Sequence, residues 1–174
     1  MTRLVAGFAV LAALGGCTTV GEVPTSRIAT VALKSSNGLP AGTAVLLAAG
    51  DKVSVNIAAV GLGEGQHGVH LHMVGTCEGP GFTTAGAHLN PDGHEHGSAN
   101  PKGSHLGDLP NLTIGSSGAG TLVADLRGSR AEVEAALFDS DGTALVVHTA
   151  PDDLRTDPTG NSGARIACGV LKRP

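Results

Sequence analysis

Apolar and polar residues alternate over eight short segments of the chain, most of them separated by turns rich in glycine, aspartate, asparagine or serine. Alternation with a period of two is typical of a β-strand with one buried face. Residues 131–137 are ambiguous, because their alanine and glutamate pattern would also allow a helical turn. The predicted strands cover residues 27–34, 43–48, 52–60, 68–74, 109–114, 120–126, 144–149 and 165–171.

Two long segments, residues 75–104 and 151–164, have no periodicity and consist largely of glycine, proline and polar residues. Unstructured loops of this length are uncommon inside a compact domain and usually have a functional reason. The whole pattern predicts one all-β domain over residues 27–174. We expect an eight-stranded antiparallel Greek-key β-sandwich or flattened barrel with two long functional loops.

Composition limits what can fill the core and what the protein can bind. Among the 174 residues there is no tryptophan or tyrosine and there are three phenylalanines, so valine, isoleucine, leucine and alanine must form the core. The formal net charge is −4. A negative chain lacks the basic surface of a nucleic-acid-binding protein, so no nucleic-acid partner is expected.

The first residues are typical of an export signal. Arg3 precedes an apolar stretch, residues 4–14, that is too short to span a bilayer. The sequence Leu-Gly-Gly-Cys that ends at Cys17 resembles a bacterial lipobox, which implies a lipoprotein signal peptide over residues 1–16, acylation of Cys17 and a tether over residues 17–26. The alternative is an ordinary signal peptide cut nearby. Both predict export to the periplasm or cell envelope, and the lipobox adds a membrane anchor.

Cysteine usage agrees with export. If Cys17 carries lipid, Cys77 and Cys168 remain as one pair. Disulfides form and persist in exported proteins, so we expect these two residues to be bridged. The alternative is a pair of independent buried thiols.

Seven of the eight histidines lie between residues 66 and 108. His70 and His72 stand two apart in an alternating segment, so both side chains project from the same face of the predicted strand. Neutral imidazole is the commonest protein ligand for metals near neutral pH. The sequence therefore predicts a metal site centred on this strand. The histidines of the cluster are His67, His70, His72, His88, His94, His96 and His105.

Six blocks of residues extend this prediction beyond a generic metal cluster. They occur in the order Gly-Val-His-Leu-His at 68–72, Ala-Gly-Ala-His-Leu-Asn-Pro at 85–91, His-Gly at 96–97, His-Leu-Gly-Asp-Leu at 105–109, Val-Val-His at 146–148 and Gly-Ala-Arg-Ile-Ala-Cys-Gly-Val at 163–170. Together they closely resemble the copper/zinc superoxide dismutases, and the resemblance covers residues 28–171.

The resemblance implies one copper and one zinc ion per subunit, with His88 as an imidazolate bridge between them. Asp152 would accept hydrogen bonds from one copper ligand and one zinc ligand, and Arg165 would guide the substrate. Cys77 and Cys168 match the family's disulfide. The implied copper ligands are His70, His72, His88 and His148. The implied zinc ligands are His88, His96, His105 and Asp108. His67 and His94 match no ligand position and are expected to be exposed.

The implied activity is the dismutation of superoxide to O₂ and H₂O₂, with His88 and Arg165 as the catalytic residues. Two other readings remain: an exported copper store or copper-delivery protein, and a surface lipoprotein that keeps the fold without turnover. A zinc hydrolase is disfavoured, because no three-ligand zinc site with an open position and a nearby general base is evident. The sequence leaves a monomer and a homodimer open.

Overall fold

A computed structural model describes residues 23–174 of the chain. The predicted signal peptide, Cys17 and residues 17–22 of the predicted tether lie outside the described residues. Within the described part, no helix is long and apolar enough to cross a membrane. The first strand begins at Thr25, two residues before the predicted start of the folded domain.

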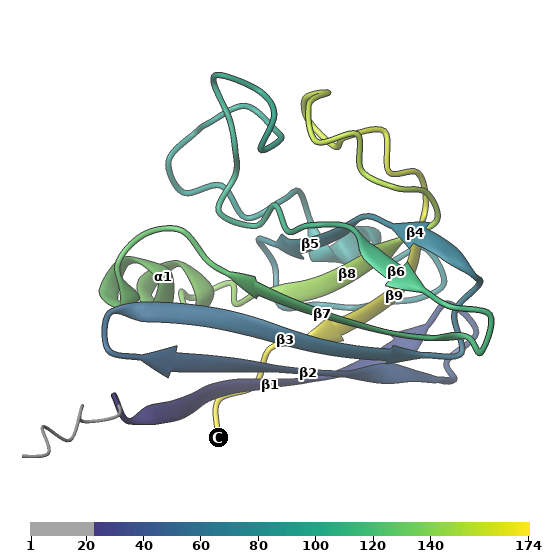
Figure 1. The fold of residues 1–174 in the computed structure, drawn as a ribbon, viewed down its shortest axis with the longest axis horizontal. Coiled ribbons are helices and arrows are strands. Elements are labelled where there is room, and N and C mark those ends of the chain that lie inside the picture. The colour runs from purple at the N-terminus through teal and green to yellow at the C-terminus, as the bar shows by residue number, and fades with distance from the viewer. Residues whose placement is uncertain (1–22) are drawn as a thin grey trace, which may run out of the picture.

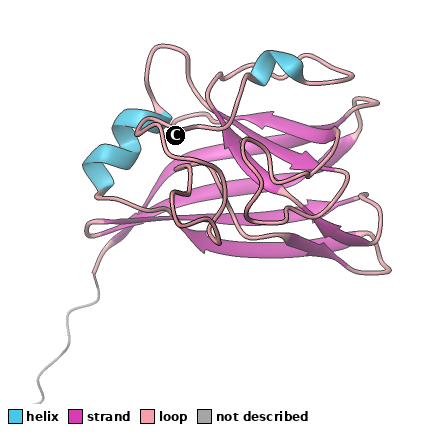
Figure 2. Ribbon diagram, turned by 90° about the horizontal axis from the view of Figure 1, so that it is seen from above, coloured by secondary structure: helices cyan, strands magenta, loops and turns pink. Residues whose placement is uncertain are grey.

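Within residues 23–174 the chain forms nine β-strands, one α-helix and one 3₁₀ helix, so the protein is almost entirely β (Figures 1 and 2). The predicted all-β fold is therefore confirmed, but with nine strands in place of the eight expected, because residues 65–67 form a short strand outside the predicted ones. The elements are β1 Thr25–Ser35, β2 Pro40–Ala49, β3 Lys52–Val60, β4 Gly65–His67, β5 Val69–His72, the 3₁₀ helix Thr83–Ala85, β6 Leu112–Ile114, β7 Ala119–Asp125, α1 Arg130–Leu137, β8 Ala144–His148 and β9 Arg165–Val170.

Seven strands form one curled antiparallel sheet in the order β5-β8-β9-β1-β2-β3-β7, and β4 pairs with β6 in a second sheet. The neighbours β9–β1 and β3–β7 are far apart in the sequence, as Greek-key connections require. In Figure 1, β1, β2 and β3 lie along the bottom of the molecule and β5, β8 and β6 lie above them. The predicted antiparallel sandwich or barrel architecture is confirmed.

Strand alternation places the apolar residues inside. In β3, for example, Val53, Val55, Ile57 and Ala59 are all buried. The core consists mainly of valine, isoleucine, leucine and alanine, as the scarcity of aromatic residues predicts. Each such side chain contributes about 1.5–3 kcal/mol when it is removed from water, and alanine less.

The ambiguous segment is the helix α1. Ser129 precedes its first residue and forms a capping box with Glu132: the Ser129 side chain accepts from the Glu132 N–H, and the Glu132 carboxylate accepts from the Ser129 N–H. Two otherwise unpaired N–H groups of the first turn and its cap are thereby satisfied. Val133 and Leu137, four residues apart, face the core.

The two predicted loops leave the same side of the sheet. We call residues 73–111 the histidine loop and residues 149–164 the carboxylate loop. Both lie at the top of Figure 1, and they contact each other, since the Ala99 N–H donates to the Leu154 carbonyl oxygen at 2.9 Å. Two segments without a hydrophobic core of their own therefore support each other above the sheet.

Leu71 tests how strand β5 is held. It is fully buried in the core, between two histidines that project from the opposite face. We expect Leu71→Ala to lower the free energy of unfolding by about 2–5 kcal/mol in urea denaturation, because it leaves a cavity. The control is Val123→Ala on β7, where the side chain is 70% exposed; its effect should stay within about 0.5 kcal/mol. Equal losses in the two variants would contradict the assigned core.

Candidate metal centre

Strand β5 is the base of the centre. Its backbone pairs with β8, which ends at His148. On its other edge, the Leu71 N–H donates to the Gly107 carbonyl and the Leu71 carbonyl accepts from the Leu89 N–H, at 2.9 and 2.8 Å. The histidine loop is thus fastened to β5 beside His88. A side chain at Gly107 would place its Cβ 2.3 Å from the Leu71 carbonyl oxygen, so this close approach requires glycine.

Four buried histidines meet where β5, β8 and the histidine loop converge. Their ligand atoms all lie within 4.8 Å of one another. Each ring has one buried nitrogen without a hydrogen-bond partner in the protein. Buried polar atoms are almost always paired, so four unpaired nitrogens facing one point fit the ligand set of a metal ion. The atoms are His70 Nδ1, His72 Nε2, His88 Nε2 and His148 Nε2.

Hydrogen bonds at the opposite ring nitrogens explain which atom is free. His72 Nδ1 lies 2.9 Å from the Gly86 carbonyl oxygen, and His148 Nδ1 lies 3.2 Å from the Gly163 carbonyl oxygen. A carbonyl can only accept, so both Nδ1 atoms carry the proton and both Nε2 atoms keep a lone pair. In His70 the roles are reversed, because Nε2 donates to Asp152 Oδ2 at 2.6 Å. The tautomer of each ring is therefore set by the fold, in the orientation that metal ligation needs.

A second set of atoms surrounds Asp108. Its Oδ1 lies 3.1 Å from His88 Nδ1, 3.0 Å from His96 Nδ1 and 3.2 Å from His105 Nδ1, and the last atom is 3.4 Å from His88 Nδ1. Four ligands at about 2.0–2.1 Å from a tetrahedral zinc ion are about 3.3 Å apart. The spacing of these side chains thus fits one tetrahedral ion.

Apart from the four histidines, one more combination of described residues has ligand atoms that all lie within 4.8 Å of one another: His70, His88, His96 and Asp108. It differs from the predicted zinc set by containing His70 in place of His105. His70 Nε2 donates to Asp152, so Nδ1 is its one remaining nitrogen and can serve one ion only. Every sequence-predicted ligand nevertheless lies in this one centre.

Asp152 connects the two groups. Its Oδ2 accepts from His70 and its Oδ1 accepts from His96 Nε2 at 3.0 Å. Burial raises its pKa, but the hydrogen bonds from His70 and His96 outweigh burial and hold the pKa well below its usual range. Sequence reasoning missed Asn111, whose side-chain amide pairs with the backbone of Asp152 in both directions, at 2.9 and 2.8 Å. The available signal was an asparagine inside a predicted strand, where this residue is disfavoured.

The protonation of the histidines follows their surroundings. Burial lowers the pKa of His72 to about 2, of His148 to about 3 and of His88 to about 4, so these rings are neutral at pH 7. For His96 burial also opposes the charged form, but the hydrogen bonds to Asp108 and Asp152 outweigh it and raise the pKa to about 9. Two carboxylates therefore attract positive charge to the His96 position, where a divalent ion could replace the proton.

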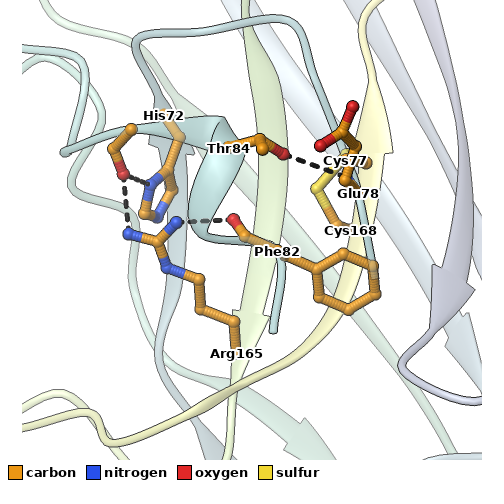
Figure 3. Close-up of a disulfide and its surroundings, with 8 residues drawn as sticks. His72, Cys77, Glu78, Phe82, Thr84, Arg165 and Cys168 are labelled. Carbon is orange, nitrogen blue, oxygen red and sulfur yellow. Dashed lines mark hydrogen bonds between the residues drawn. A yellow bond between two sulfur atoms is a disulfide. The ribbon is translucent and has the colours of Figure 1, made fainter. Parts of the chain in front are cut away.

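Arg165 and the disulfide lie on the side of the first group where His72 stands (Figure 3). Arg165 donates to the carbonyl oxygens of Phe82 and Gly86, both at 2.6 Å, and the Gly86 oxygen also contacts His72. The predicted bridge between Cys77 and Cys168 is present and links residues 91 apart in the sequence. It ties the segment that supplies the two carbonyls to β9, which carries Arg165.

The two unassigned histidines behave differently. His94 is exposed, as predicted. The prediction for His67 is wrong: its side chain is buried, with Nδ1 2.7 Å from the His148 carbonyl oxygen and Nε2 3.0 Å from the Gly63 carbonyl oxygen. The physical reason is that the backbone of Gly68 pairs with His148 and Ala150, at 2.9 and 2.8 Å, and so holds the neighbouring His67 ring against the end of β8. His67 therefore joins the loop before β4 to the backbone of His148.

An antiparallel β-sandwich with two adjoining histidine-rich ligand sets defines a class of β-sandwich metalloproteins. Comparison with known proteins gives the family. The family model "Copper/zinc superoxide dismutase (SODC)" matches residues 40–171. The chain belongs to the copper/zinc superoxide dismutase family, and its two ligand sets are of the kind that could bind copper and zinc.

Individual relatives agree with the family. The Cu-Zn superoxide dismutase of Caulobacter vibrioides is 39% identical over 150 residues, which cover 83% of this chain and 85% of the relative. Cu-Zn superoxide dismutase 2 of Aquifex aeolicus is 37% identical over 147 residues, covering 80% and 84%. The crystal structure of a SOD-like protein from Bacillus subtilis has a TM-score of 0.78 and 34% identity, covering 84% of this chain and 100% of that one.

The disulfide yields a stability prediction. Replacing Cys77 and Cys168 together by alanine should lower the free energy of unfolding by about 2–5 kcal/mol in urea denaturation, because the unfolded chain gains freedom over a long loop. The same experiment with reductant supplies the control: reductant should destabilise the wild type and leave the double variant unchanged. A double variant as stable as the oxidised wild type would contradict a stabilising bridge.

Proposed function

We propose that the protein catalyses the dismutation of superoxide, in which two superoxide anions and two protons become O₂ and H₂O₂. The position of His88 carries the proposal. Its Nε2 lies with the free nitrogens of His70, His72 and His148, while its Nδ1 lies 3.1 Å from Asp108 Oδ1. One imidazole faces two ligand sets, and membership of the family supports the same function.

We assign copper to the first set and zinc to the second, one ion of each per subunit. Imidazole nitrogens suit copper among the first-row metals. Three imidazole nitrogens and one carboxylate oxygen make a closed tetrahedral zinc site without an open position, which has a structural role. The copper ligands are His70, His72, His88 and His148. The zinc ligands are His88, His96, His105 and Asp108.

The redox chemistry, acceptance of an electron from one superoxide and its donation to a second, is what bound copper would supply. The protein's own part is to move a proton. His88 Nε2 has no hydrogen-bond partner in the protein, so this atom can hold a proton in one half of the cycle and release it to the peroxide product. His88 Nδ1 stays beside Asp108, and the ring keeps its place while Nε2 changes its protonation.

Arg165 would attract the substrate. The formal net charge of the chain is −4, so a superoxide anion needs a local positive charge to reach the centre. The two carbonyl oxygens that accept from Arg165 fix its guanidinium beside His72. The charge of Arg165 also acts on the His72 ring. Burial is the largest cause of the lowered pKa of His72, and repulsion from Arg165 lowers this pKa further.

We also propose that the protein acts in the periplasm or cell envelope. The support is the signal-like sequence over residues 1–16 and the disulfide, a bond that persists in oxidising compartments. Acylation of Cys17 would add a membrane anchor at the end of a short tether.

The test of the proposed function is the rate of superoxide decay with purified protein that holds one copper and one zinc ion. Protein concentration must come from amino-acid analysis, because tryptophan and tyrosine are absent. We expect a second-order rate constant near the ceiling of about 10⁸–10⁹ M⁻¹s⁻¹ that superoxide dismutases are known to reach. The control is the same protein loaded with zinc alone. Equal decay in both samples would contradict the proposal.

Arg165 supplies a second prediction. Arg165→Ala should lower the rate several-fold and flatten its dependence on ionic strength, since salt screens the attraction that the variant has lost. Arg165→Lys should retain part of both. The matched control is Arg27→Ala, which removes the same charge from an exposed position on β1. A rate and salt dependence unchanged in Arg165→Ala would exclude a guiding role for this residue.

A further inference from the structure

Asp157 in the carboxylate loop contacts two of the proposed zinc ligands. Its Oδ1 accepts a hydrogen bond from the backbone N–H of His96 at 2.6 Å. The same oxygen lies 3.8 Å from His105 Nε2, and the Asp157 side chain is 47% exposed. Nothing in the function described so far uses this residue.

The contact between Asp157 and His105 depends on which ring nitrogen of His105 carries the proton. His105 Nδ1 lies 3.2 Å from Asp108 Oδ1 and 3.4 Å from His88 Nδ1, so this atom belongs to the second ligand set. If Nδ1 provides a lone pair to a metal, Nε2 must carry the ring proton. That N–H then faces the carboxylate of Asp157.

In the other two histidines of the second ligand set, the outer ring nitrogen, the one that does not face the proposed zinc ion, already has a partner or a role. His88 Nε2 belongs to the first ligand set, and His96 Nε2 donates to Asp152. The outer nitrogen of His105 is left, and Asp157 is the carboxylate within ion-pair distance of it. Histidines that bind a metal generally direct their other N–H to a carboxylate, a carbonyl or a water, which orients the ring and strengthens its lone pair.

We propose that Asp157 is a positioning residue for zinc, a proposal that rests on the proposed function. Its negative charge favours the positive charge that the His105 ring acquires when Nδ1 binds a cation. A separation of 3.8 Å is too long for a direct hydrogen bond but lies within reach of charge attraction. Its hydrogen bond to the His96 N–H holds the carboxylate loop against the histidine loop at the same point.

Two substitutions separate the charge from the hydrogen bond. Asp157→Asn keeps an oxygen that can accept from the His96 N–H but removes the charge that faces His105. Asp157→Ala removes both. The matched control is Asp153→Asn, which removes one charge from the same loop; Asp153 accepts from Arg155, Thr156 and Asn161, which are outside both ligand sets.

The experiment is titration of the metal-free protein with Zn²⁺ against a competing chelator, together with the visible spectrum of Co²⁺ bound in the same site. We expect Asp157→Asn to weaken zinc binding about tenfold and to shift the Co²⁺ bands, and Asp157→Ala to lose at least as much, within the range of about 10–100-fold for such partners. The zinc affinity of Asp153→Asn should stay within about twofold of that of the wild type, because Asp153 contacts no residue of either ligand set.

The proposal is overturned if Asp157→Asn binds zinc like the wild type with an unchanged Co²⁺ spectrum, because loop anchoring would then suffice. It is also overturned if Asp153→Asn loses as much affinity, because loop charge alone would then explain the effect. A wild-type protein that takes up no Zn²⁺ or Co²⁺ at these histidines would instead refute the zinc assignment, while the superoxide-decay assay tests the proposed activity separately.

Discussion

The buried imidazole of His88 is the constraint on which the centre depends. One nitrogen faces three unpaired histidine nitrogens, and the other faces Asp108. A buried polar atom without a hydrogen-bond partner costs about 1–3 kcal/mol. Several such atoms at one point are therefore costly in the metal-free protein, and a bound metal ion removes this cost by becoming their partner. Metal binding and folding are then coupled, because a ligand set assembled from β5, β8 and the histidine loop does not exist in the unfolded chain.

The two long loops show how this coupling replaces a hydrophobic core. Most residues of the hydrophobic core lie on strands, although the histidine loop adds Leu89 and Leu109. The strands also supply His70, His72 and His148. The remaining ligands lie on the histidine loop. That loop is held by hydrogen bonds to β5, by the disulfide, and by Asp152 and its neighbours in the carboxylate loop. Few apolar contacts are needed when polar contacts and ligands fix the backbone at several points.

Much of this could be predicted from the sequence, and the exceptions have physical causes. Alternation located the strands and put His70 and His72 on one face. Helix α1 stayed ambiguous because its stability comes from the cap at Ser129 and from burial, which short-range pattern does not reveal. His67 was expected to be exposed, although it shares the parity of the buried Val69 and Leu71. Its partners are backbone carbonyls, and backbone partners leave no mark in the side-chain sequence.

The claim that His88 joins two metal sites can be measured directly by electron paramagnetic resonance of the Cu²⁺-loaded protein. With Zn²⁺ as the second ion, we expect a full Cu²⁺ signal. With Co²⁺ as the second ion, we expect the signal to be lost or strongly broadened, because an imidazolate between two paramagnetic ions couples their spins. A Cu²⁺ signal of equal intensity and width in both samples would contradict the shared imidazole.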